Sequence, residues 1–183
     1  MLPPDVQTVK GSHAWYSILF PALMAFAAAS DLFTMTISNR VSLLLVLGFA
    51  VLAAAGGMGL FDVLLHLGAA GAVLAVTFFC FAMGWMGGGD AKMASAIALW
   101  FGFAHLLDFL LYASVFGGAL TLLLIEFRRW PLPYVLAGQP WLLRLHHNET
   151  GIPYGIALAI GALIVYPDTP WIKMVDLSRF IAG

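Results

Sequence analysis

Six apolar stretches divide the chain, and shorter polar stretches separate them. A membrane-spanning helix needs about 20 predominantly apolar residues, so a stretch of that length predicts a transmembrane helix. The sequence therefore predicts an all-α, polytopic membrane protein with about six transmembrane helices, in a single membrane-embedded domain over residues 1–183. The apolar stretches cover residues from about 14 to 30, 41 to 59, 60 to 84, 91 to 104, 105 to 126 and 151 to 167.

Some of these boundaries are poorly marked. The fourth stretch is short, and only Gly102 to His105 separates it from the fifth, so a re-entrant fourth segment is an alternative. Residues 31–40 and 127–150 are more polar, and we expect both to be loops, the second being the longest.

The first stretch has a second interpretation. Lys10, the apolar run after it and Ala27-Ala28-Ala29-Ser30 also resemble a cleavable signal peptide. Cleavage there would remove one of the six spans and leave Asp31 at a new N-terminus. We therefore favour a retained first span.

The composition agrees with a bilayer environment and excludes other classes of protein. Hydrophobic residues make up 62% of the chain and charged residues 9%, with a formal net charge of −1. Neither a basic stripe nor a run of arginines is present, so we expect no nucleic-acid partner. Cys80 is the only cysteine, which excludes a disulfide framework or a cysteine-built zinc site within this chain. We expect no metal and no cofactor.

Two acidic residues are the leading candidates for a site. An ionisable group at membrane depth costs several kcal/mol or more and is normally retained for function. Asp31 follows one predicted crossing and Asp90 follows three, so both emerge on the same face whichever way the protein inserts. With the N-terminus outside, the basic residues divide into an inside set of Arg40, Lys92, Arg128, Arg129 and Arg144 and an outside set of Lys10, Lys173 and Arg179, which weakly favours an inside location for the aspartates.

The residues before Asp90 suggest access to its carboxylate. Gly87, Gly88 and Gly89 lack a Cβ atom, so backbone, water or an extended peptide can approach closely. A simpler role for Asp90 is to cap the free N–H groups of the helix that follows. Two neighbouring carboxylates cannot both ionise easily and share a proton, so a pair can activate water and protonate a leaving amine. Helix dipoles would place that proton on Asp31, at a helix end, rather than on Asp90, at a helix start.

Three stretches carry a family resemblance. Gly87-Gly88-Gly89-Asp90-Ala91-Lys92 resembles the Gly-x-Gly-Asp-x-Lys signature of the type IV prepilin peptidases, which are intramembrane aspartyl proteases. Residues 31–40 resemble the family's first aspartate motif, which usually ends in Ile-Pro-Asn; here Ser38 replaces the proline and Asn39 is retained. Gly151-Ile152-Pro153-Tyr154-Gly155 resembles the entry to the family's last span.

The resemblance implies an activity and a set of site residues. Asp31 and Asp90 would be the catalytic aspartates, and Gly87, Gly88, Gly89, Lys92 and Asn39 would shape the loops and the substrate site. It implies that the protein cuts a short hydrophilic leader from prepilins or pseudopilins at the cytoplasmic face of the bacterial inner membrane. Many members carry an insert with paired cysteines and methylate the new N-terminus. This chain lacks both the insert and the cysteines, so it resembles the short Tad or Flp form without a methyltransferase.

Other hypotheses stay open at this point. A small transporter or channel could use acidic residues as an ion pathway, although such a site normally lies near mid-bilayer and accompanies an internal repeat. A presenilin-type protease would pair Gly-x-Gly-Asp with Tyr-Asp on the preceding span, which this chain lacks. The remaining polar groups could bind a metal, but hydrogen bonding or solvation is their simpler explanation; they are the pairs Asp62 with His66 and His105 with Asp108, and the loop His146-His147-Asn148-Glu149. The sequence does not indicate an oligomeric state.

Overall fold

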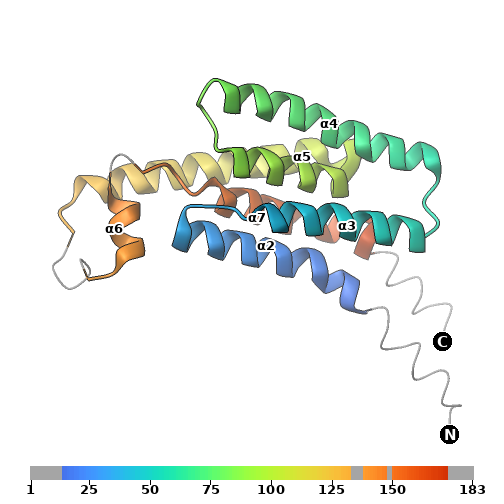
Figure 1. The fold of residues 1–183 in the computed structure, drawn as a ribbon, viewed down its shortest axis with the longest axis horizontal. Coiled ribbons are helices and arrows are strands. Elements are labelled where there is room, and N and C mark those ends of the chain that lie inside the picture. The colour runs from blue at the N-terminus through green and yellow to red at the C-terminus, as the bar shows by residue number, and fades with distance from the viewer. Residues whose placement is uncertain (1–13, 133–137, 148–149, 173–183) are drawn as a thin grey trace, which may run out of the picture.

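The computed structural model describes residues 14–132, 138–147 and 150–172, and all regular structure in these ranges is helical. The helices lie roughly side by side, and consecutive helices run in opposite directions along the bundle (Figure 1). The predicted all-α fold is confirmed. The elements are α2 (Ala14–Thr34), α3 (Asn39–Ala55), α4 (Leu60–Ala82), α5 (Gly88–Arg129), α6 (Pro140–His146), α7 (Tyr154–Val165) and the 3-10 helix η1 (Tyr166–Asp168).

The long helix α5 is two helices joined at Gly102. This residue has φ 57° and ψ −170°, a backbone conformation that glycine adopts without strain. The chain turns back on itself there (Figure 1). The part before Gly102 runs antiparallel to α4, as Ser95 Oγ donates to Ala70 O. The part after it runs antiparallel to α7, with Gly117 against Tyr154 and Gly161 against Ala113. The described apolar helices therefore number six, as the sequence predicts.

The turn at Gly102 leaves backbone carbonyls that two side chains satisfy. The last carbonyls of a helix have no partner within the helix, and lipid offers none. His66 Nδ1 lies 2.7 Å from Leu99 O, and Trp171 Nε1 donates to Trp100 O at 2.7 Å. His66 lies six residues after the start of α4 at Leu60, which is about 9 Å along the helix axis. The first part of α5, which ends at Gly102, therefore stops about one and a half turns short of the level at which α4 begins. His66 therefore has a structural role at this turn.

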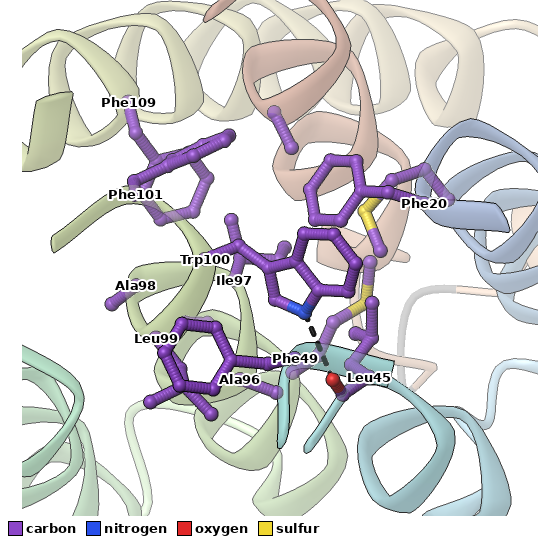
Figure 2. Packing of buried hydrophobic residues seen from close by; sticks show 14 of the residues in the cluster. Phe20, Leu45, Phe49, Ala96, Ile97, Ala98, Leu99, Trp100, Phe101 and Phe109 are labelled. Atoms are coloured by element: carbon purple, nitrogen blue, oxygen red, sulfur yellow. Dashed lines mark hydrogen bonds between the residues drawn. The ribbon is translucent and has the colours of Figure 1, made fainter. Parts of the chain in front are cut away.

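The core surrounds the residues just before this turn. Trp100 is fully buried, with its ring against Phe20 and Trp171, and its Nε1 atom donates to Leu45 O at 2.9 Å (Figure 2). Phe20 also stacks on Tyr166, with ring centroids 4.6 Å apart. Cleavage after Ser30 would remove Phe20 from this core.

The outer faces of the helices are apolar, as expected for lipid contact. Leu60–Ala82 and Gly88–Arg129 are long and apolar enough to cross a bilayer, and shorter apolar helices accompany them. Large apolar side chains are exposed along α3 and α4, among them Leu43, Leu47, Val51, Val76 and Phe78.

The predicted loop at residues 31–40 is largely wrong. Helix α2 continues through Asp31 to Thr34, and the N–H of Met35 still donates to Asp31 O at 2.8 Å. Met35 has φ 55°, the left-handed conformation that commonly ends a helix. Ser38 then accepts the N–H of Arg40 and caps α3. Only residues 35–38 connect the two helices, so Asp31 is held by helix backbone.

Candidate active site

Asp31 is the more deeply buried of the two candidate aspartates, at 4% relative exposure. Its Oδ2 atom accepts the backbone N–H of Gly155 at 2.7 Å. Gly155 is the second residue of α7, so the first turn of that helix points a free N–H group at the carboxylate. Oδ1 accepts no hydrogen bond from the described residues. One oxygen of Asp31 is thus fixed by a backbone N–H group.

Asp90 is the third residue of α5 and is partly exposed. Its carboxylate turns back toward Gly87, the residue that precedes the helix. The hydrogen bonds of the described residues include none made by the Asp90 side chain at this helix start, so its capping role stays a prediction.

The two carboxyl groups lie at the same end of the bundle. The end of α2, the start of α5 and the start of α7 lie together on the left of Figure 1. Asp31 lies against Gly155 beside Ile37, and Ile37 also lies against Gly89, the residue before Asp90. Because both aspartates lie beside a helix start, helix dipoles do not distinguish them, which removes the basis for placing the shared proton on Asp31.

Ile37 connects the two halves of the site. A Cβ atom at Gly155 would lie 2.7 Å from Ile37 Cδ1 and 2.8 Å from Asp31 Oδ2. A Cβ atom at Gly89 would lie 3.2 Å from Ile37 Cβ and 3.4 Å from Ile37 O. The close approach at Gly89 is therefore to the segment between α2 and α3, rather than to the carboxylate of Asp90.

The other predicted loop residues lie around Asp90. A Cβ atom at Gly87 would lie 2.9 Å from Asp90 Oδ2, and one at Gly88 would lie 3.2 Å from the ring of Phe81. Lys92 Nζ donates to Asn39 Oδ1 at 3.0 Å, and both side chains are exposed. The hydrogen bond thus joins α5, two residues after Asp90, to the first residue of α3.

Gly155 is the part of the site that sequence reasoning did not place. Its Pro-Tyr-Gly motif was noted as the entry to the last span, but its contact with Asp31 spans 124 residues of sequence. The signal was present in the motif itself, since a glycine at a helix start can present an N–H group at close range.

The model of the type IV leader peptidase family matches residues 18–122, which is more than half of the chain. The chain belongs to the type IV leader peptidase family. The resemblance noted in the sequence is confirmed. As a leader peptidase family member, this membrane protein is a peptidase, and both aspartates lie inside the matched region. Comparison with curated proteins and with solved structures gave no match.

Among the residues that the structure describes, the other polar groups of this leader peptidase family member do not gather into a metal site. The described residues contain no group of three His, Cys, Asp or Glu side chains that could hold an ion. His146 Nε2 lies 2.8 Å from Trp130 O, and Asp62 and Asp108 are exposed. Asn148 and Glu149 lie outside the described residues.

Proposed function

We propose that the protein is a membrane aspartyl endopeptidase in which Asp31 and Asp90 are the catalytic pair. Its substrates are type IV, Flp-like prepilins or pseudopilins, from which it removes the leader peptide at the cytoplasmic membrane face. The observation that carries the proposal is the placement of two carboxylates, from segments far apart in sequence, at one end of the bundle, with Asp31 fixed by the backbone N–H of Gly155 at a helix start.

This geometry suits hydrolysis by a shared proton. One carboxylate takes a proton from water while the water oxygen attacks the scissile carbonyl carbon, and the other carboxyl group donates its proton to the carbonyl oxygen. The tetrahedral intermediate then breaks its C–N bond: the carboxyl group that took a proton from water gives it to the leaving nitrogen, which becomes the new amino terminus. A hydroxyl group of the intermediate returns its proton to the other carboxylate as the carbonyl re-forms, which restores the starting pair. A low-dielectric surrounding strengthens these charge interactions, and Asp31 is almost fully buried.

The position of the pair favours a substrate cut at the membrane boundary. Both aspartates lie at an end of the bundle, where a hydrophilic leader can stay in water while the apolar helix after it remains in lipid. Arg40, Lys92, Arg128 and Arg144 belong to the elements at this same end, which supports the cytoplasmic orientation. The opposing basic residues Lys10, Lys173 and Arg179 lie outside the described residues.

One further feature supports the short form of the enzyme. Only residues 35–38 join α2 to α3, which leaves no room for an insert after the first aspartate. We therefore propose that this domain carries no methyltransferase activity. A transporter is a weaker proposal, because the aspartates lie at one end of the bundle rather than near its middle.

Co-expression with an Flp-type prepilin tests the proposal, with leader loss followed by mass spectrometry. Asp31→Asn and Asp90→Asn should each abolish cleavage and retain membrane insertion, because water activation needs both carboxylates and the shape is kept. Asp62→Asn is the matched control, since Asp62 is an exposed carboxylate at the other end of the bundle. Substantial cleavage by either folded site variant would refute the pair.

A further inference from the structure

The short helix α6 contacts the end of α2 that carries Asp31. Arg144 Nη2 donates to Phe33 O at 2.7 Å, and the ring of Trp141 meets the ring of Phe33 edge-on at 5.6 Å between centroids. Phe33 lies in the last turn of α2, where a carbonyl has no partner within the helix. Arg144 therefore fixes the backbone two residues beyond Asp31.

A second arginine holds the chain that leads to the other side of Asp31. Arg128 Nε donates to Leu145 O at 2.8 Å, and its Nη2 atom donates to Thr150 O and Gly151 O, both at 3.0 Å. These carbonyls belong to α6 and to the residues just before α7. The N–H of Gly155 that reaches Asp31 comes four residues after Gly151. Both backbone segments that hold Asp31 are thus tied to α6.

We propose that Arg144 is a positioning residue for Asp31, acting through the Phe33 carbonyl. The inference rests on the proposed function, in which Asp31 reacts with water and substrate. A cation at a helix C-terminus is stabilised by the dipole, and a charged donor makes a shorter and stronger hydrogen bond than a neutral one. A displacement of about 1 Å at a reacting group can cost about 100-fold in rate. Arg144 holds Asp31 against such a displacement.

The structure supplies a matched control in Arg129. This residue lies at the same end of the bundle, carries the same charge and is exposed, but its Nη1 atom pairs with Glu126 Oε2 at 3.0 Å on its own helix. Loss of Arg129 removes the same charge and leaves the hydrogen bond from Arg144 to Phe33 O intact.

The experiment compares Arg144→Ala and Arg144→Lys with Arg129→Ala in the purified full chain. Cleavage of an Flp-type prepilin should show a kcat that falls about 10- to 100-fold in Arg144→Ala, with KM within about twofold, because the loss concerns chemistry rather than substrate binding. Arg144→Lys should recover part of the rate, since its ammonium can still reach the carbonyl. Arg129→Ala should match the wild type.

A readout without substrate separates this inference from the proposed function. The carboxyl band of Asp31, assigned in pH-difference infrared spectra with Asp31→Asn, should move in Arg144→Ala and stay in place in Arg129→Ala. An unmoved band in Arg144→Ala overturns the positioning role, and so does a kcat equal to that of Arg129→Ala. If the wild type fails to cut the prepilin, the proposed function fails while the infrared comparison still decides the role of Arg144. Should the alanine variant not fold, Arg144→Gln carries the same comparison, because it keeps a donor without the charge.

Discussion

The replacement of Gly155 by alanine tests how Asp31 is held. The new Cβ atom would lie 2.7 Å from Ile37 Cδ1, 2.8 Å from Asp31 Oδ2 and 3.1 Å from Asp31 Cβ. Ile37 Cδ1 is the end of a flexible side chain and can move. The carboxylate can move only by leaving the N–H of residue 155, which it accepts at 2.7 Å. The substitution therefore separates Asp31 from its hydrogen-bond donor.

The magnitude follows from the contacts that are lost. A hydrogen bond to a charged group contributes about 1.5 to 3 kcal/mol, and overpacking costs about 1 to 3 kcal/mol. If the lost bond is needed to orient the carboxylate in the transition state, the rate of cleavage should fall about 10- to 150-fold, at about 1.4 kcal/mol per factor of ten. The assay is prepilin cleavage with thermal unfolding measured in parallel.

Two further variants decide the cause. Gly118→Ala is the control, because a Cβ atom there meets nothing within 4 Å and alanine favours a helix interior. Adding Ile37→Val to Gly155→Ala removes Cδ1 and so relieves the clash with Ile37 alone. The double variant should remain slow. Recovered activity in the double variant would show that the clash with Ile37 was the cause. That result, or equal rates for Gly155→Ala and Gly118→Ala, would refute the proposed loss of the hydrogen bond to Asp31.

Two other predictions concern the surroundings of the site. Lys92→Met and Asn39→Ala should each lower the rate of cleavage several-fold. The double variant should be no slower than the slower single variant, because the two side chains form one hydrogen bond. Additive losses would show that the two residues act separately. His66→Ala should lower the free energy of unfolding by about 1 to 3 kcal/mol, measured by denaturant titration, because Leu99 O then lacks a partner; an unchanged stability would contradict the capping role.

The number of helices and the convergence of the aspartates could be predicted because both depend on local hydropathy and on the parity of crossings. One crossing precedes Asp31 and three precede Asp90, so both aspartates emerge on the same face of the membrane. Helix packing does not change this parity. The turn at Gly102 was less clear, because apolar residues lie on both sides of it and only one glycine marks the reversal.

The end of α2 could not be predicted correctly because its polar residues resemble a loop. Thr34 Oγ1 donates to Ser30 O at 2.7 Å, so a side chain typical of loops satisfies its hydrogen bond within the helix. The contacts of Gly155 and Arg144 depend on how α6 and α7 pack against α2, and no sequence spacing contains that information.

The hydrogen bond between Gly155 and Asp31 also has a consequence for biosynthesis. The two residues are 124 positions apart, and the ribosome adds about 5 to 20 residues per second, so Asp31 waits about 6 to 25 seconds for its partner to be made. For the later part of that time, after Asp90 has also been made, both aspartates exist without the helix start that orients Asp31. Under the proposed function, we therefore expect cleavage activity to arise only after α7 has been inserted.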